Sequence, residues 1–218
     1  MIELNLQYFG GRGSAGARGG ASGGGAKQVE ITDNDWMDWA ADPEPFQAAL
    51  NGEKMPNVSQ ADGHTYTKEE KKRMKEVAQE MQLQAESSIV SENTLFRGES
   101  YNSLAEAKAK YKVGKSITND KLTSYATESD IATMYAGASM DFAGSKAVKV
   151  VITNTNVSNK VGGSVGIHTD PFAIGGSAEV VTPKGLKSKV VGSSYDKESN
   201  TLFVRMENSA TPKKRSKR

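Results

Sequence analysis

Glu179 and Arg97 have side chains whose chemistry suits a reaction that develops positive charge beside a phosphate-bearing ligand. Glu179 lies in residues 175–185 (GGSAEVVTPKG), where adjacent valines predict a short strand that Pro183 and Gly185 end. A carboxylate fixed beside a forming cation stabilises the transition state more than the substrate. Arg97 ends the short apolar stretch TLFRG. A guanidinium, unlike an ammonium, binds two phosphate oxygens in fork geometry.

A third stretch, residues 122–127 (LTSYAT), has the pattern of a small polar strand that runs into a helix. Taken alone, Glu179 would be a solvated carboxylate on a strand. Taken together and in this order, the three stretches resemble the arginine, Ser-x-Ser and Glu-x-Glu motifs of mono-ADP-ribosyltransferases. The branch concerned contains Rho-modifying clostridial exoenzymes, binary actin toxins and phage-encoded transferases. The resemblance covers about residues 66–207.

The resemblance implies an enzyme that uses NAD as a substrate and transfers ADP-ribose to a protein. Glu179 is then the expected catalytic carboxylate, and Ser124 is expected to hydrogen-bond and position it. Arg97, followed by Gly98, is expected to bind the diphosphate of NAD. The alternative is that Arg97 forms a surface ion pair with Glu99 or another acid. Tyr125 either flanks the nicotinamide or points outward.

Two positions depart from the family pattern. Ala126 stands where a second serine is usual, and Ser177 stands two residues before the catalytic glutamate. In the family, a glutamate at the latter position accompanies arginine acceptors and a glutamine accompanies asparagine acceptors. An arginine acceptor is protonated at neutral pH and needs a nearby carboxylate to become a nucleophile. Ser177 therefore favours an amide, a hydroxyl or water as the acceptor.

The long loop before Glu179, residues 162–176, contains Pro171, Phe172 and paired glycines. It matches the flexible acceptor-recognition loop of the family, with Phe172 expected to contact the acceptor protein or the cofactor. The alternative is an ordinary long loop with one buried aromatic side chain.

Charge and composition exclude several classes of function. The chain of 218 residues has a net charge of +2 and is 36% hydrophobic, which is low for a fully packed chain. Five of the 28 basic residues lie in the last six positions; without them, 23 basic residues face 26 acidic ones. The body of the protein is therefore no basic nucleic-acid binder, and the tail would make only weak contacts of that kind.

Metal, thiol and membrane functions also lack support in the sequence. There is no cysteine, and the two histidines, His64 and His168, show no metal-ligand spacing, so we expect no metal site. No apolar run approaches the ~20 residues that span a bilayer. We expect a protein of the host cytoplasm, with delivery inside a virion as one route.

Three parts are expected along the chain: a flexible glycine-rich leader (1–30), a transferase-like domain (31–208) and a basic tail (209–218). The opening LNLQYFGGRGS resembles the start of head-associated proteins in phages of Gram-positive bacteria. The leader is thus either disordered or a strand that docks on a capsid or partner.

Helical signals gather in the first half of the domain and strand signals in the second, which predicts an α+β fold. The resemblance implies N-terminal helices packed on a two-sheet β core. Asp33 or Asn34 is expected to cap a short helix that carries Trp36 and Trp39 on one face and is interrupted by Pro43 and Pro45. Both tryptophans are expected to pack onto the domain, the alternative being that they stack on a ligand.

Further elements are expected at 46–50 (helix, ended by Gly52), 67–85 (helix), 95–97 (strand), 103–111 (helix), 127–138 (helix), 148–153 (strand) and 202–206 (strand). The helix at 67–85 starts with a capping box of Thr67 and Glu70, and apolar residues then recur at helical spacing: Met74, Val77, Ala78, Met81 and Ala85. The helix at 127–138 has one apolar stripe, formed by Ile131, Met134, Tyr135 and Ala138.

The same sequence features are compatible with two other functions. One is a virion or interaction protein that keeps the fold but has lost the activity, as the substitutions Ala126 and Ser177 suggest. The other is NAD hydrolysis, in which water replaces the acceptor.

Overall fold

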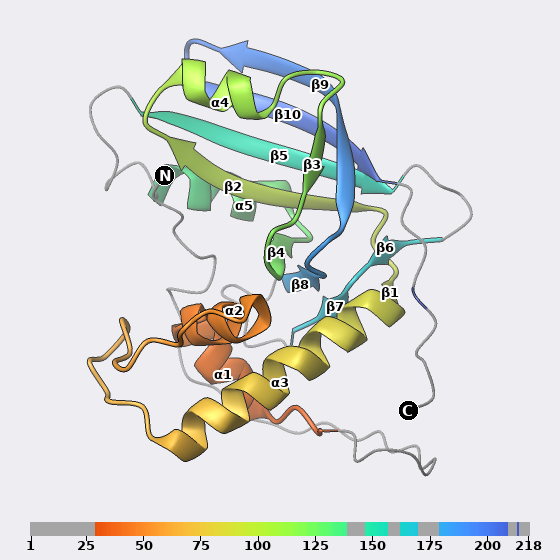
Figure 1. The fold of residues 1–218 in the computed structure, drawn as a ribbon. Coiled ribbons are helices and arrows are strands. Elements are labelled where there is room, and N and C mark those ends of the chain that lie inside the picture. Colours follow the sequence, from red (N-terminus) through yellow and green to blue (C-terminus); the bar gives the residue numbers. More distant parts are fainter. Residues whose placement is uncertain (1–28, 139–146, 157–161, 170–178, 209–212, 214–218) are drawn as a thin grey trace.

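The computed structural model describes residues 29–138, 147–156, 162–169, 179–208 and 213. Helices come first and strands dominate later, so the expected α+β fold is confirmed (Figure 1). Residues 1–28 of the predicted leader (1–30) and most of the basic tail lie outside the described residues.

The three N-terminal helices begin and end where local chemistry dictates. Helix α1 (Asp33–Ala41) starts at a capping box formed by Thr32 and Asp35. Helix α2 (Glu44–Asn51) has proline in its first turn and ends at Gly52, whose φ of 70° is left-handed. Helix α3 (Lys68–Ser87) starts at the predicted box of Thr67 and Glu70.

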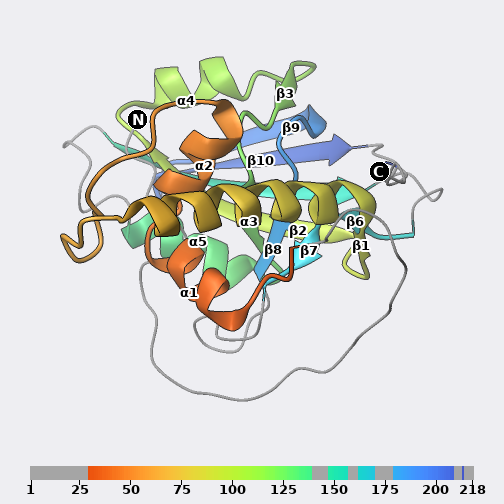
Figure 2. The same cartoon turned by 60° about the horizontal axis from the view of Figure 1, so that its bottom comes forward.

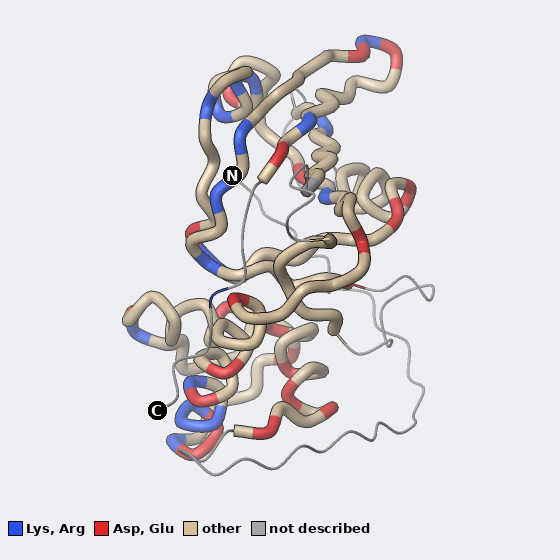
Figure 3. The backbone as a smooth tube through the Cα atoms, turned by 90° about the vertical axis from the view of Figure 1, so that its right-hand side faces the viewer, with Lys and Arg blue, Asp and Glu red and all other residues tan. Residues whose placement is uncertain are grey.

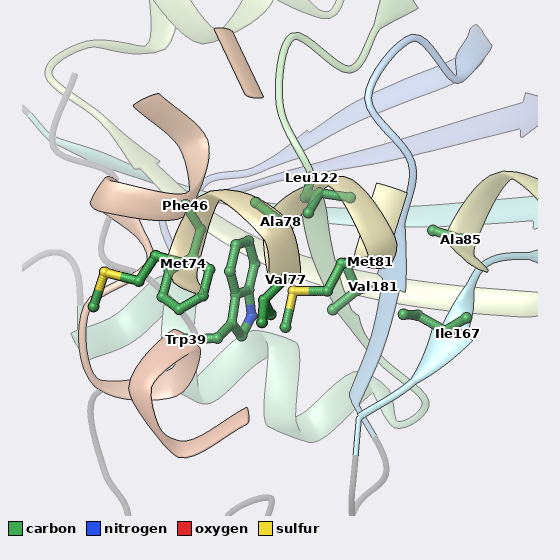
Figure 4. Packing of buried hydrophobic residues seen from close by; sticks show 10 residues of the cluster. All are labelled: Trp39, Phe46, Met74, Val77, Ala78, Met81, Ala85, Leu122, Ile167 and Val181. Carbon is green, nitrogen blue, oxygen red and sulfur yellow. The ribbon is translucent and has the colours of Figure 1, made fainter. Parts of the chain in front are cut away.

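Helix α3 carries an apolar stripe that holds the helical layer on the sheet. Its buried members lie at helical spacing and pack with Trp39 of α1, Phe46 of α2 and the strand residue Val181 (Figure 4). The rings of Trp39 and Phe46 meet edge to face, with centroids 5.7 Å apart. The predicted packing of both tryptophans is confirmed, since Trp36 also packs against this cluster.

The strands form an eight-stranded sheet and a two-stranded one. The large sheet has the order β3-β9-β10-β5-β2-β4-β8-β7 (Figure 1). Its strands are β2 (Thr94–Tyr101), β3 (Ser116–Thr118), β4 (Thr123–Ala126), β5 (Val148–Asn156), β7 (Ile167–His168), β8 (Glu179–Thr182), β9 (Lys187–Asp196) and β10 (Thr201–Asn208). The small sheet pairs β1 (Ile89–Val90) with β6 (Ser164–Val165).

The large sheet is joined in its middle by one residue pair. Strands β2 and β5 pair over eight positions, from Thr94↔Thr155 to Tyr101↔Val148. On the other side of β2, Phe96↔Ala126 is the single backbone pair with β4. Five strands therefore lie on one side of this junction and β4, β8 and β7 on the other.

Helices α4 and α5 cover opposite faces of the five-stranded part. Helix α4 (Leu104–Lys110) lies over Val148, Val150 and Ile152 of β5. Helix α5 (Ser129–Ala138) packs its small residues on Val151 and Phe96, which face the other way (Figure 2). This helix begins at Ser129, two residues after the predicted start at Thr127.

Charged residues of both signs are spread over the helical and sheet parts of the described chain (Figure 3). Lys213, the one described residue of the tail, contacts the domain: its Nζ lies 2.7 Å from Oε1 of Glu86 on α3. No helix in the described ranges is long and apolar enough to cross a membrane.

Candidate active site

The three stretches singled out in the sequence lie on three neighbouring strands. Arg97 is on β2, Ser124 on β4 and Glu179 on β8, and β4 pairs with both of the others (Figure 1). Register links them through one position, because Ala126 pairs with Phe96 on one side and with Glu179 on the other. The fold thus brings together residues that are 27 and 55 positions apart in the chain.

Glu179 is the first residue of β8 and is half-buried. The Thr169 hydroxyl donates a hydrogen bond of 3.0 Å to Oε2 of Glu179, and the Thr169 backbone N–H donates one of 3.0 Å to the Glu179 carbonyl. Thr169 itself is buried and follows the short strand β7. The Glu179 carboxylate is therefore oriented by a hydrogen bond within the protein. It is not the solvated carboxylate that its place on a strand would suggest when taken alone. Thr169 had no signal in the sequence, because only the tertiary fold brings it to Glu179.

Ser124 lies on the same face of the sheet as Glu179. Ser124 pairs with Val181 and Ala126 pairs with Glu179, and side chains two residues apart on a strand share a face. Ser124 and Glu179 are therefore diagonal neighbours across β4 and β8. Ser124 is buried, and Ala126 beside it places a methyl group where the family pattern has a hydroxyl.

Arg97 lies on the opposite face from Glu179 by strand alternation, at the junction between β2 and β4. Its Nη1 donates a hydrogen bond of 2.8 Å to the Ser124 carbonyl. Its Nε donates one of 2.9 Å to Oε1 of Glu99, the partner named in the alternative reading. This ion pair is buried and not superficial, because both side chains are less than a tenth exposed. The arginine and serine motifs are thus in direct contact.

Gly98 and Tyr125, predicted as cofactor-binding residues, have positions that favour packing roles. A Cβ at Gly98 would lie 1.9 Å from the Ala132 carbonyl oxygen of α5, so only glycine allows this helix to approach β2. Tyr125 is buried in a cluster with Val90, Leu95 and Val180, so it neither points outward nor faces Glu179.

Tyr135 of α5 is a residue near the site that the sequence did not single out. Burial, and next the negative charge of Glu179, raise the pKa of the Tyr135 phenol to about 12. Tyr135 was predicted only as part of the apolar stripe of its helix. Its proximity to Glu179 depends on how α5 crosses the sheet, which spacing along the helix cannot reveal.

Ser177 and Phe172, the predicted acceptor-recognition residues, lie outside the described residues. The histidines are engaged elsewhere, His64 with Glu70 at 3.1 Å and His168 with Glu92 at 3.1 Å. Within the described ranges, no group of three or more His, Cys, Asp or Glu side chains could hold a metal ion.

Comparison with known proteins gives matches in structure alone. No family model matches the chain, and no curated protein matches it. The Vis toxin, an ADP-ribosyltransferase from Vibrio splendidus, superposes with a TM-score of 0.50 over 81% of this chain and 71% of the toxin, at 12% identity.

This chain has the ADP-ribosyltransferase fold.

Two further structures superpose with slightly lower scores. The Salmonella SpvB ATR domain has a TM-score of 0.49, at 13% identity, over 81% of this chain and 97% of that domain. An ADP-ribosyltransferase from Clostridium botulinum also has a TM-score of 0.49, at 16% identity, over 81% of this chain and 85% of its own. The ADP-ribosyltransferase fold agrees with the resemblance noted from the three sequence motifs.

Proposed function

We propose that this protein is a NAD-dependent mono-ADP-ribosyltransferase that modifies a protein. The observation that carries the proposal is the half-buried Glu179, oriented by Thr169 on a strand next to Ser124 in an ADP-ribosyltransferase fold. We assign residues 31–208 to the transferase domain, 1–30 to a leader and 209–218 to a basic tail.

The chemistry follows from the charge of NAD. The bond between C1′ of the ribose and the nicotinamide nitrogen breaks, and the nicotinamide leaves as a neutral base with the bonding electrons. No general acid is needed, because the departing ring is already positive in NAD. The ribose becomes an oxocarbenium ion, which the Glu179 carboxylate stabilises while it holds the 2′-hydroxyl. The acceptor then bonds to C1′ and loses its proton.

Ser124, on the same face as Glu179, and Arg97, at the junction of β2 and β4, have separate tasks in the proposal. Ser124 positions Glu179, and Arg97 binds the NAD diphosphate, which suits a guanidinium. Gly98 and Tyr125 would contribute by packing, next to the cofactor site. Phe172 would contact the acceptor or the cofactor from the loop before β8.

The acceptor is an amide or hydroxyl of a protein and not an arginine. Ser177 adds no carboxylate to deprotonate a guanidinium. We propose a host protein as the partner, a phage as the source and the host cytoplasm as the place of action. The leader would associate with a capsid and allow delivery in the virion. Exoenzyme S has been solved with human 14-3-3 protein beta and bound carba-NAD, so that neighbour has both a protein partner and a NAD analogue.

Transfer of label tests this proposal. Host lysate is incubated with NAD labelled in the ADP-ribose part and with the wild-type protein, Glu179→Gln or Glu198→Gln. Glu198 lies in the exposed turn between β9 and β10 and serves as the matched control. We expect wild type and Glu198→Gln to label a protein band and Glu179→Gln to label it at least a hundredfold less. Equal labelling by Glu179→Gln would show that the site assignment is wrong. Mass spectrometry of the band identifies the modified residue type.

Ala126 favours a second candidate, an inactive transferase-like protein of the virion. Its buried methyl group replaces a hydroxyl of the Ser-x-Ser motif. Calorimetry at millimolar NAD separates the two functions, since an inactive fold should produce no heat of binding. A glycohydrolase would instead release free ADP-ribose from NAD with no other protein present.

A further inference from the structure

Glu99 is the centre of a buried polar cluster behind Arg97. It lies on β2 with Arg97 and Tyr101, and alternation places all three side chains on one face. The Glu99 carboxylate accepts hydrogen bonds from Arg97 Nε at 2.9 Å, Tyr111 Oη at 2.7 Å and Tyr101 Oη at 2.8 Å. Lys110 Nζ lies 3.6 Å from Oε2. Glu99 therefore connects the arginine motif to helix α4.

The carboxylate of Glu99 is ionised despite being only 9% exposed. Burial alone raises the pKa of Glu99, but the charges of Arg97 and Lys110 and the hydrogen bonds from Tyr111 and Arg97 lower it to about 2. A buried carboxylate that is ionised and satisfied on both oxygens makes a rigid anchor.

The charges of the cluster do not cancel. Arg97 and Lys110 are two cations around one anion, so the cluster keeps a net charge of +1. If Glu99 paired with Arg97 alone, the pair would be neutral and would attract a diphosphate less strongly. Lys110, on helix α4, supplies the second positive charge and so gives the cluster its net charge of +1. Its ammonium also lies over the rings of Tyr101 and Tyr111, 5.2 Å from each centroid.

We propose that Glu99 is a positioning residue for NAD binding: it fixes the Nε edge of Arg97, while Lys110 keeps the cluster positive. Arg97 is then held at two points, by Glu99 and by the Ser124 carbonyl, so its guanidinium plane has one orientation before NAD arrives. The inference rests on the proposed function, because it gives Arg97 the task of binding the diphosphate.

A purely structural role for the cluster would predict something different. In that case Glu99 would only hold α4 on the sheet. Removing any hydrogen bond of the cluster would then lower the stability of the fold and leave the affinity for NAD unchanged. Tyr111→Phe is the matched control, because it removes one hydrogen bond to Glu99 without touching Arg97.

The test compares wild type, Glu99→Gln and Tyr111→Phe. Kd for NAD is measured by calorimetry, KM and kcat by label transfer, and the midpoint of unfolding by heating. Glu99→Gln raises the net charge of the cluster from +1 to +2, which favours a diphosphate, but it weakens the hold on the Nε edge of Arg97. We expect the loss of orientation to dominate and to raise Kd and KM for NAD about tenfold, which one charge-assisted hydrogen bond can supply, with kcat changed less than about threefold. Tyr111→Phe should lower the unfolding temperature with Kd within about twofold of wild type. An unchanged Kd in a folded Glu99→Gln overturns the inference.

Two further measurements keep the outcome decisive. If Glu99→Gln does not fold, Lys110→Met replaces it; we expect Kd for NAD to rise about threefold, and an unchanged Kd overturns the inference. In the protein without NAD, the Arg97 Nε–H signal in nitrogen NMR should exchange slowly in wild type and rapidly in Glu99→Gln. This signal tests the anchoring even if wild type neither binds NAD nor transfers label, a result that would contradict the proposed function alone.

Discussion

The Thr169 hydroxyl lies 3.0 Å from Oε2 of Glu179 and donates a hydrogen bond to it. A donor at this position holds the carboxylate in one rotamer on the face that it shares with Ser124. Thr169 therefore acts on catalysis through Glu179 if Glu179 stabilises the oxocarbenium ion.

Thr169→Val keeps the shape of the side chain and removes the donor. We expect kcat to fall about tenfold to a hundredfold, the effect of one hydrogen bond to a charged group. KM for NAD should change little, because Thr169 has no part in binding the diphosphate. Thr169→Ser keeps the hydroxyl and should restore most of kcat. Label transfer at several NAD concentrations separates the two constants, and a valine variant with wild-type kcat would contradict this role.

Gly98→Ala should destabilise the fold. Its added methyl group would meet backbone atoms of α5, the Ala132 carbonyl at 1.9 Å and the Ala136 nitrogen at 2.6 Å, and backbone cannot rotate away. We expect a loss of about 1–3 kcal/mol or more in the free energy of unfolding, measured with urea.

Gly137→Ala in the same helix is the control for Gly98→Ala. Nothing lies within 4 Å of its added methyl group, and alanine favours helix by up to about 1 kcal/mol over glycine. Equal stabilities of the two variants would show that α5 does not pack closely on β2.

The phenol of Tyr135 reports on Glu179 without any assay of activity. Burial and then the charge of Glu179 raise its pKa to about 12. Glu179→Gln removes the negative charge but not the burial, so the pKa of Tyr135 should fall while staying above 10, the ordinary value. A titration followed by carbon NMR of labelled tyrosine measures it. An unchanged pKa would mean that the two side chains lie farther apart in solution.

Stability should depend on Glu99 in acid. The pKa of Glu99 is near its ordinary value of 4.5 in the unfolded chain and about 2 in the folded protein. Between these values, lowering the pH protonates the unfolded chain first, so the free energy of unfolding falls as the pH falls. Urea unfolding from pH 5 to pH 2.5 should show this loss in wild type. Glu99→Gln should show a shallower slope over the same range, and equal slopes would count against the buried ion pair.

The residue at position 177 should control the acceptor. Ser177→Glu introduces the carboxylate that a guanidinium acceptor requires. We expect the variant to gain transfer to a small guanidinium compound such as agmatine, while wild type shows none. Ser177→Ala is the control and should gain nothing. Transfer to agmatine by wild type would contradict the proposal that arginine is not the acceptor.

Local signals in the sequence predicted much of the helical layer. The capping box at Thr67 and the spacing of Met74, Val77 and Met81 predicted both the start and the buried face of α3. The glycine stop at Gly52 predicted the end of α2. These features depend on neighbours within one or two turns, which a single sequence contains.

The sheet and the contacts of the site were harder to predict. Strand β9 was missed because lysines, serines and a glycine hide its alternation. Of its two partners, β10 follows after a short turn, but β3 lies about 70 residues earlier in the chain. The pairing of Arg97 with Glu99 was considered only at the surface, since its burial depends on Tyr101, Lys110 and Tyr111 closing over it. Thr169 and Tyr135 reach Glu179 only after the sheet has assembled.

The single pair Phe96↔Ala126 has a consequence for the width of the site. A regular ladder of backbone hydrogen bonds keeps neighbouring strands about 4.8 Å apart along their length. Because β4 and β2 pair at one position alone, backbone hydrogen bonds do not fix the distance between the two strands on either side of that pair. Arg97 lies on the β2 side of this junction and Glu179 on the β8 side, so the distance between them depends on side-chain contacts such as the Arg97–Ser124 hydrogen bond as well as on the one backbone pair.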